Sequence, residues 1–355
     1  MKKLHVAVIG TVGLPACYGG FESLVENLVE HCSPEIFYTI YSSSKSYTHF
    51  LTEYKGAKIE YIPLSANGVQ SIPYDIISLF KALFLKPDVT LILGVSGCVF
   101  LPIFRLFYRG KIVTNIDGLE WRRQKWGRFA KLFLKFSERL AVRFSDVVIA
   151  DNQAITDYVK QEYELDAVTI AYGGDHVLVK GIAPNVTEKP FFLSLCRIEP
   201  ENNVSMILEA FSKSSGVNLK FIGNWDRSEY GKSLKLQYSD FTNIDIIDPI
   251  YDLDELFDLR NQCVGFVHGH SAGGTNPSLV EAMHFGKPIF AFDCNFNRYS
   301  TENKALYFNS PEELNEKITF ATSDDLAAIS RNMKLIAENR YTWKVINQMY
   351  EVTYQ

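Results

Sequence analysis

The sequence lacks the features of a membrane-spanning or disulfide-stabilised protein. It contains no run of 18 uncharged apolar residues, the length that a membrane-spanning helix needs, so we expect no transmembrane segment. The apolar stretch near the N-terminus is too short for a signal peptide and leads into a glycine turn, as a first strand does. The six cysteines are scattered, with no Cys-x-x-Cys pair. This spacing argues against a zinc site and a disulfide framework and is typical of a cytoplasmic protein.

Two cofactor signals are also missing. The first glycine loop, Gly10-x-x-Gly13, lacks the Gly-x-Gly-x-x-Gly spacing of dinucleotide-binding turns, and no acidic residue ends a clear second strand. NAD binding is therefore disfavoured. His268 and His270 alternate at the end of a predicted strand, but no third metal ligand accompanies them. We expect no metal and no other cofactor.

The charge of the chain is unevenly distributed. The whole chain carries −5, but residues 81–143 contain 13 basic and four acidic residues and carry +9, which leaves −14 on the rest. Such segregation indicates an anionic partner on one face of one domain.

The pattern of apolar runs predicts two α/β domains. Residues 4–10 form a continuous apolar strand of the kind buried in a parallel sheet, and helical patterns separate most later strands. This alternation predicts a doubly wound, Rossmann-like sheet, and the pattern restarts at residue 191. The expected strands are 37–41, 58–62, 89–93, 112–116 and 147–150 in the first domain and 191–195, 219–222, 244–247, 265–267 and 288–292 in the second.

These strands also predict the domain boundaries. We expect an N-terminal domain over residues 1–176, a glycine- and proline-containing linker, and a C-terminal domain over residues 190–340. An amphipathic helix at about 343–355 is expected to pack back on the first domain. Two such domains face each other across a cleft at the carboxyl ends of their strands, where ligands bind in these folds.

The most informative segment runs from His268 to Met283. Small polar residues lead into a helix that Pro277 opens, and Gly286 ends that helix before an apolar strand. Exposed backbone N–H groups and the helix dipole make the helix start an anion site. Glu281 is suited to bind sugar hydroxyls rather than a phosphate of its own charge. A nucleotide sugar carries a diphosphate beside sugar hydroxyls, so the segment predicts a nucleotide-sugar site. The alternative is that Glu281 is an exposed helix carboxylate, since the helix dipole alone favours an acid near a helix start.

Two features of the N-terminal half are candidates for binding or catalysis. Gly19-Gly20 permits the close backbone approach that a phosphate or sugar needs, or else forms a tight turn. Asp117 and Asp151 each follow a predicted strand, where an acid is more often a helix cap than a catalyst. Asp151 is open to that interpretation because a helix starts directly after it. Our hypothesis is that Asp117 orients or deprotonates an acceptor hydroxyl, with Asp151 in support.

A basic and aromatic segment follows Asp117. Periodicity places basic residues on one helix face and Phe129, Leu132, Phe133, Phe136 and Leu140 on the opposite face. Together with apolar and basic stretches at 76–86 and 100–109, the segment predicts a surface seated on an anionic bilayer. A solvated charged face with a buried apolar face is the alternative, and the acidic balance of the chain disfavours nucleic acid. The residues expected at the membrane or the acceptor are Trp121, Arg122, Arg123, Lys125, Trp126, Arg128, Lys131 and Lys135.

Longer motifs resemble one enzyme family. Arg197 to Asn203 resembles the donor motif of family 4 glycosyltransferases of the GT-B fold, and Gly273 to Glu281 resembles their glutamate-x7-glutamate motif. Gly10 to Glu22 and Asp117 to Arg123 resemble bacterial β-1,4-rhamnosyltransferases that build cell-wall and capsule polysaccharides. The resemblance spans nearly the whole chain and implies two Rossmann-like domains facing across a cleft.

The sequence departs from this family at two positions. Gly273 stands where most relatives carry the first glutamate, and Asn202 stands where most carry a phosphate-binding lysine. Arg197 is then the fixed positive charge left for the diphosphate, helped by neutral hydrogen-bond donors. Fewer polar partners at Gly273 would suit rhamnose, a 6-deoxy sugar. The residues expected to bind the donor are Arg197, Asn202, Gly273, Gly274, Thr275, Asn276, Ser278 and Glu281, with Gly19 and Gly20.

The resemblance implies a specific reaction. L-Rhamnose would pass from TDP-rhamnose to a lipid diphosphate-linked GlcNAc or glucose at the cytoplasmic face of the cell membrane, with retention of configuration. No divalent metal is implied, because Arg197 and the helix start can stabilise the leaving diphosphate. The alternatives are a transferase using a UDP- or GDP-sugar, a sugar-nucleotide epimerase, and a non-catalytic nucleotide-sugar-binding module. The oligomeric state stays open, with a homo-oligomer among the options.

Overall fold

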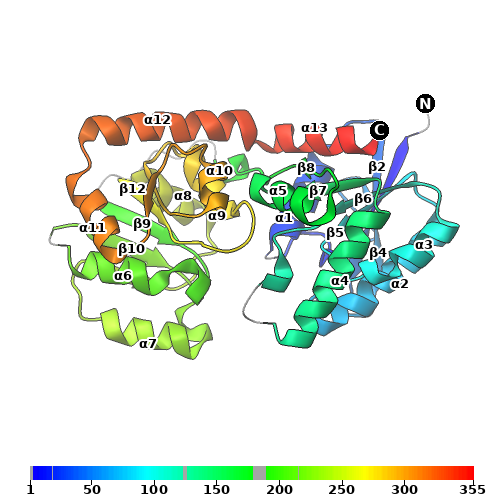
Figure 1. The fold of residues 1–355 in the computed structure, drawn as a ribbon, viewed down its shortest axis with the longest axis horizontal. Helices are drawn as coiled ribbons and strands as arrows, with labels where there is room; N and C mark the ends of the chain where they lie inside the picture. Colours follow the sequence, from blue (N-terminus) through cyan, green and yellow to red (C-terminus); the bar gives the residue numbers. More distant parts are fainter. Residues whose placement is uncertain (1–2, 18, 123–125, 179–188, 215) are drawn as a thin grey trace. The chain divides into compact units, whose positions relative to one another are not determined.

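The computed structural model describes residues 3–17, 19–122, 126–178, 189–214 and 216–355. The chain divides into two compact units. Unit 1 comprises Met1–Tyr172 and Trp343–Gln355, and unit 2 comprises Gly173–Thr342. The C-terminal helix, red in Figure 1, therefore belongs to the same unit as the N-terminal strands, which are blue.

Unit 1 is built on one eight-stranded sheet with the strand order β3-β4-β2-β1-β5-β6-β7-β8. Every neighbouring pair is parallel except β3 and β4, which form an antiparallel hairpin at one edge. Because the parallel strands share one direction, their carboxyl ends meet at one edge of the sheet. The strands are β1 (Leu4–Ile9), β2 (Ile36–Ser43), β3 (Glu53–Tyr54), β4 (Ala57–Ile62), β5 (Val89–Leu93), β6 (Lys111–Asn115), β7 (Val147–Ala150) and β8 (Val168–Thr169).

Helices connect these strands and bury their apolar sides in the core of unit 1. Leu24 and Leu28 lie four residues apart on one helix face, and both are buried against the sheet. The C-terminal helix packs against α1 and β6, and the hydroxyl of its Tyr350 accepts a 2.8 Å hydrogen bond from Asn115 Nδ2. The helices are α1 (Gly20–Glu30), α2 (Ser71–Leu85), α3 (Leu101–Phe107), α4 (Arg128–Phe144), α5 (Gln153–Tyr163) and α13 (Trp343–Tyr354), with 3-10 turns η1 (Gly68–Gln70), η2 (Cys98–Phe100) and η3 (Glu120–Arg122).

Unit 2 repeats this architecture with a six-stranded, fully parallel sheet in the order β11-β10-β9-β12-β13-β14. Its core is rich in aromatic side chains, among them Phe211, Phe221 and Phe290, which are fully buried. The strands are β9 (Phe191–Leu195), β10 (Asn218–Ile222), β11 (Ile244–Ile247), β12 (Gly265–His268), β13 (Ile289–Phe292) and β14 (Leu306–Phe308). The helices are α6 (Val204–Ser212), α7 (Glu229–Tyr238), α8 (Leu253–Gln262), α9 (Pro277–His284), α10 (Asn295–Ser300), α11 (Pro311–Phe320) and α12 (Ser323–Arg340), with 3-10 turns η4 (Asp175–Val177), η5 (Pro200–Asn202) and η6 (Trp225–Arg227).

The observed architecture confirms the expected pair of Rossmann-like parallel sheets. The edge strands β3, β8 and β14 have only two or three residues each and were not predicted from the sequence. Such short segments are too brief for an apolar period to be recognised.

Candidate functional site

The start of α9 has the geometry that the sequence predicts. Asn276 is the N-cap, and its Oδ1 accepts hydrogen bonds from the Ser278 backbone N–H at 3.0 Å and from the Ser278 hydroxyl at 2.8 Å. Pro277 occupies the first helical turn, where its missing N–H costs nothing. Gly273 has a φ of 105°, which favours glycine at this point in the loop. Gly274 and Thr275 lie between Gly273 and the cap, so all of these predicted donor residues gather at one helix start.

Glu281 is the fifth residue of α9, and its carboxylate is held by two neighbours. Oε2 accepts a short hydrogen bond from Arg260 Nη2 of α8, whose side chain is only 5% exposed. Oε1 lies 3.5 Å from His176 Nε2 in the η4 turn. The Glu281 side chain itself is 15% exposed, so it is not the solvated helix carboxylate that was the alternative interpretation.

Arg260 and His176 were not predicted from the sequence. Burial is the main cause of a lowered pKa for His176, and the Glu281 charge opposes this shift while the Arg260 charge adds to it. The backbone before His176 packs closely on α9, because a Cβ on Gly174 would lie 2.9 Å from the Glu281 backbone nitrogen. Arg260 is 21 residues from Glu281 in sequence, and no local pattern signals such a pair.

Asn202 lies near Arg197, but its side chain turns into the protein. Its Nδ2 donates to the Arg197 carbonyl at 2.7 Å, and its Oδ1 lies 2.7 Å from Nδ1 of His270. Asn202 is 3% exposed. Its amide therefore ties the loop after β9 to the loop after β12. The Arg197 side chain is 36% exposed and lies 3.8 Å from Glu199 Oε1.

The histidines at the end of β12 do not form a metal site. His268 is buried, and burial and the neighbouring His270 lower its pKa to about 3. Among the described residues, no group of three or more histidine, cysteine, aspartate or glutamate side chains could hold a metal ion.

The first loop of unit 1 is organised around Glu22, a buried residue of α1. Its Oε1 accepts from the Val12 backbone N–H at 2.8 Å and from the Thr11 hydroxyl at 3.2 Å. Gly19 has no room for a side chain, because a Cβ there would lie 1.9 Å from Glu22 Oε2. A Cβ on Gly20 would be in ordinary contact with the Tyr172 ring, at 3.7 Å. The loop is thus a closely packed turn at the carboxyl end of β1.

Asp117 and Asp151 follow β6 and β7, so they lie at the carboxyl edge of the unit 1 sheet. Asp117 has a φ of 60°, and its backbone N–H donates to Asn115 Oδ1 at 2.9 Å. The N-cap of α5 is Asn152, not Asp151, so the helix-cap alternative for Asp151 is wrong. Burial raises the pKa of Tyr172 and of Tyr350, and the charges of both aspartates raise it further. The carboxylates of Asp117 and Asp151 therefore both lie near the buried phenol groups of Tyr172 and Tyr350.

The basic segment departs from its prediction in one way. It is not one helical stretch, since Trp121 and Arg122 lie in η3 and α4 begins only at Arg128. The alternative, a buried apolar face, is wrong for these side chains, because Phe129 is 90%, Leu132 69% and Phe136 56% exposed. The buried residues of α4 are instead Leu134, Ser137, Glu138, Ala141 and Val142. Arg123 and Lys125 lie outside the described residues.

Glu138 is the polar centre of the buried face of α4. It accepts hydrogen bonds from Trp121 Nε1 at 2.9 Å and from the hydroxyls of Tyr158 and Tyr163 at 2.7 and 2.6 Å. Lys135 lies 3.6 Å from Glu138 and over the rings of all three aromatic residues. Trp126 donates to Glu120 at 3.0 Å. Trp121 and Lys135 thus hold α4 in place, whereas Arg128 is exposed and Lys131 is partly exposed.

The exposed apolar side chains of α4 have counterparts on α2 and α3. Helices α2 and α3 are in contact, as are α3 and α4. We call the following set the amphipathic surface: Ile77, Phe80, Phe84, Ile103, Leu106, Phe107, Phe129, Leu132 and Phe136, with the exposed basic residues Lys81, Arg109, Arg128, Arg139 and Arg143. No described helix has the length and apolar character needed to span a bilayer.

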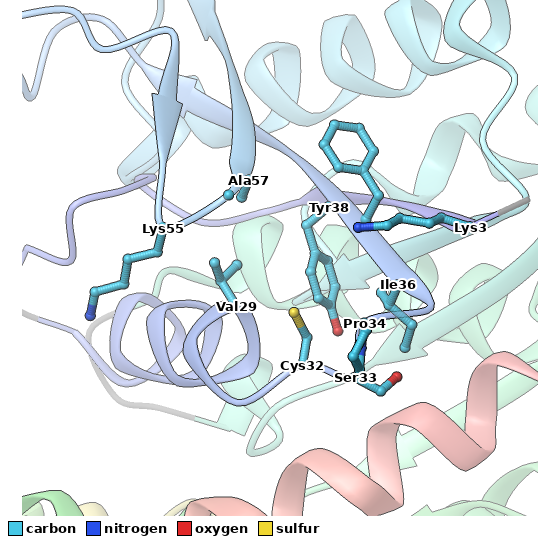
Figure 2. Close-up of a pocket in the computed structure, with 11 residues that line it drawn as sticks. Lys3, Val29, Cys32, Ser33, Pro34, Ile36, Tyr38, Lys55 and Ala57 are labelled. Carbon is cyan, nitrogen blue, oxygen red and sulfur yellow. The ribbon is translucent and has the colours of Figure 1, made fainter.

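A pocket of about 170 Å³ lies away from these residues, in unit 1. Lys3, Ile36 and Ala57 line it, and they mark the amino ends of β1, β2 and β4 (Figure 2). The pocket is therefore at the sheet edge opposite Asp117 and Asp151, and it is not part of the candidate site.

The two units match two families. Residues 180–340 match the family described as "Glycosyl transferases group 1", and residues 3–175 match "Domain of unknown function (DUF1972)". The chain thus joins a group 1 glycosyltransferase domain to a DUF1972 domain. The expected glycosyltransferase class is confirmed at this level, whereas the rhamnosyltransferase branch stays a prediction. No curated protein matches the sequence.

Solved structures share the fold over the full length of the chain. A sucrose-phosphate synthase from Thermosynechococcus elongatus has a TM-score of 0.82 at 14% identity, covering 99% of this chain and 98% of that chain. HepE from Anabaena, in complex with UDP, has a TM-score of 0.74 at 18% identity, covering 99% of both chains. An α,α-trehalose-phosphate synthase from Burkholderia xenovorans, in complex with glucose-6-phosphate, scores 0.73 at 12% identity and covers 99% and 100%. These likenesses establish the GT-B fold.

Proposed function

We propose that this protein is a glycosyltransferase that moves L-rhamnose from TDP-rhamnose onto a lipid diphosphate-linked GlcNAc or glucose. The observation that carries the proposal is the position of Glu281 in α9, one turn after the Asn276 cap, inside the group 1 glycosyltransferase domain. A carboxylate beside an open helix start can bind sugar hydroxyls while the backbone N–H groups bind a phosphate. The UDP complex of HepE, a protein of the same fold, supports a nucleotide-sugar donor.

The donor diphosphate is assigned to Arg197 and the start of α9. The guanidinium of Arg197 is partly exposed. The neutral hydrogen-bond donors expected to bind the diphosphate with it belong to Gly273 to Asn276, which directly precede α9. Asn202 takes a supporting part, because its buried amide fixes the Arg197 carbonyl and His270. In transfer, the bond from the sugar carbon to the diphosphate oxygen breaks, and these groups stabilise the charge that the leaving diphosphate gains.

The acceptor is assigned to unit 1. Asp117 and Asp151 lie at the carboxyl edge of its sheet, the edge at which ligands bind in such folds. We assign to Asp117 the orientation or deprotonation of the acceptor hydroxyl, with Asp151 in support, whereas Gly19 and Gly20 stay proposed donor residues. An Asp117→Asn variant that folds should lose transfer activity by at least about a hundredfold, the range of a general base. Full activity in this variant would remove Asp117 from the mechanism.

The lipid part of the acceptor is assigned to the amphipathic surface. Exposed phenylalanine and leucine side chains beside arginines are suited to seat α2, α3 and α4 in the interface of an anionic bilayer. In this proposal the protein binds peripherally to the cytoplasmic face of the cell membrane, where lipid-linked intermediates are available. Flotation with anionic vesicles at low salt tests the assignment, and protein that stays at the bottom of the gradient contradicts it.

One observation favours a second function, that of a non-catalytic nucleotide-sugar-binding module. Gly273 and Asn202 stand where most family 4 relatives carry a glutamate and a lysine, and the buried Asn202 amide bonds within the protein. Incubation of the purified protein with TDP-rhamnose, UDP-glucose, a GDP-sugar and a synthetic lipid-linked acceptor separates the possibilities. Product with TDP-rhamnose alone supports the proposal, product with another donor contradicts the rhamnose assignment, and binding without product favours the module. Epimerisation of the donor without an acceptor would identify an epimerase.

A further inference from the structure

The carboxylate of Glu281 is shared between two side chains that the motif does not include. Arg260 takes Oε2 through a short hydrogen bond, and His176 Nε2 lies 3.5 Å from Oε1, a close contact that is longer than a normal hydrogen bond. Arg260 is almost fully buried, so its guanidinium needs a counter-charge close by. Glu281 supplies that charge. The carboxylate therefore has a fixed orientation before any ligand arrives.

The Arg260 pairing also changes the electrostatics of the helix start. A free carboxylate in α9 would repel a phosphate bound at Asn276 and Pro277. The Arg260 guanidinium compensates the negative charge of Glu281, so the helix start keeps its attraction for an anion. Glu281 can then serve as a hydrogen-bond acceptor next to a diphosphate without opposing its binding.

His176 is held against Glu281 by its own backbone. The Gly174 backbone packs on α9 so tightly that a Cβ would lie 2.9 Å from both the Glu281 nitrogen and the His284 ring. The Gly174 N–H donates to the Tyr341 carbonyl at 2.7 Å, and His284 Nε2 lies 2.9 Å from the same carbonyl. His176 is thus a fixed neighbour of Oε1, and burial lowers its pKa.

We propose that Arg260 and His176 are positioning residues of the donor site and that they limit Glu281 to one sugar hydroxyl of the nucleoside. The inference rests on the proposed nucleotide-sugar function. An ionised carboxylate has about four acceptor positions on two oxygens. A ribose presents two neighbouring hydroxyls and needs both oxygens, whereas a 2′-deoxyribose presents one. Arg260 takes one acceptor position on Oε2, and the His176 ring covers Oε1 of a largely buried side chain, so that one position on Oε2 is left for a single hydroxyl.

The test compares two nucleotides that differ only at the 2′-hydroxyl. TDP and its ribose analogue, 5-methyluridine diphosphate, are titrated calorimetrically against the full-length protein and against a His176→Ala variant. Removal of the imidazole leaves Oε1 open to the second hydroxyl. The ratio of the two dissociation constants should shift toward the ribose nucleotide by about two- to tenfold, the value of one net hydrogen bond. The variant His176→Gln, which can again place an N–H near Oε1, should restore most of the original ratio.

Two controls separate positioning from folding. The exposed His49 lies in unit 1, and His49→Ala should leave the ratio unchanged. A Glu281→Gln/His176→Ala double variant should show no shift relative to Glu281→Gln, because His176 acts through the carboxylate. If both nucleotides bind and His176→Ala leaves their ratio unchanged, the inference is wrong while the proposed function stands. If the unaltered protein binds neither nucleotide, the proposed function fails and the inference with it.

Discussion

The buried carboxyl group of Asp75 should make the protein less stable as the pH rises. Asp75 lies on α2 and is 3% exposed. Its Oδ2 accepts a 3.2 Å hydrogen bond from the Gly97 backbone N–H, and its Oδ1 has no hydrogen-bond partner among the described residues. Burial raises its pKa from 3.8 to about 8, and the Gly97 hydrogen bond opposes the shift only in part. The perturbation is Asp75→Asn, which removes the ionisation and keeps an oxygen for Gly97.

The raised pKa of Asp75 determines the direction in which the stability of the folded protein changes with pH. Below pH 3.8 the carboxyl is protonated in both the folded and the unfolded chain. As the pH rises toward 8, the unfolded chain releases the proton while the folded chain keeps it, so the unaltered protein loses stability. Each pH unit in this window corresponds to about 1.4 kcal/mol. Between pH 3.8 and pH 7 the loss amounts to at most about 4 kcal/mol.

The assay is guanidinium unfolding of both proteins at pH 5, 6 and 7, followed by far-ultraviolet circular dichroism. With each pH unit, the unfolding free energy of Asp75→Asn should rise by about 1.4 kcal/mol relative to that of the unaltered protein. A constant difference in unfolding free energy caused by the substitution itself does not change this slope. Asp240→Asn, at an exposed position, changes the net charge equally and should show no such slope. Parallel pH profiles for Asp75→Asn and the unaltered protein would refute the reasoning, because they would mean that Asp75 is ionised in the folded state.

Three further predictions concern the site and the surface. Arg260→Met should destabilise unit 2 by about 3 kcal/mol because it leaves the Glu281 charge uncompensated, and adding Glu281→Gln should recover most of the loss in thermal unfolding. Phe129→Ser with Leu132→Ser should weaken binding to anionic vesicles by tenfold or more at unchanged thermal stability, whereas Leu236→Ser, an exposed change in unit 2, should leave vesicle binding intact. The depressed pKa of His268, about 3 against 6.5, means that stability present above pH 6.5 is lost as the pH falls toward 3. At pH 5 this loss is about 2 kcal/mol, and His268→Gln should be free of it in denaturant titrations.

The two sheets could be predicted because their strands are continuous apolar runs. Strands such as β5 and β12 are buried along their whole length, so they read as apolar segments separated by helices. The start of α9 was also readable, since an N-cap asparagine before a proline is a local signal. These features depend on neighbours in the sequence, which is why the sequence alone was enough.

The orientation of α4 could not be predicted, because the helix has apolar residues on more than one face. Its buried face contains Glu138, which is acceptable only because Trp121, Tyr158 and Tyr163 donate hydrogen bonds to it. Trp121 lies in η3, and Tyr158 and Tyr163 lie in α5. The sequence of α4 alone therefore does not indicate that these residues contact Glu138. The sequence therefore left open whether Phe129 and Leu132 are buried, and the fold exposes them.

The partners of Glu281 and Asn202 escaped prediction for the same reason. Arg260 and His176 come from α8 and η4, and only the folded unit brings them to the carboxylate. Asn202 was expected to face the donor because its position in the motif normally holds a lysine. The structure shows its amide bonded to Arg197 and His270, and a contact with the donor stays a prediction.

Rhamnose transfer measured with and without the Glu281 carboxylate tests whether the start of α9 is the donor site. Purified protein is given TDP-rhamnose and a synthetic lipid diphosphate-linked GlcNAc in anionic vesicles, and the rhamnosylated lipid is quantified by mass spectrometry beside a folded Glu281→Ala variant. We expect product with the unaltered protein and a loss of at least about a hundredfold in the variant, because a buried polar contact to the substrate is removed. Equal product formation by the two proteins would contradict the assignment of α9 as the donor site.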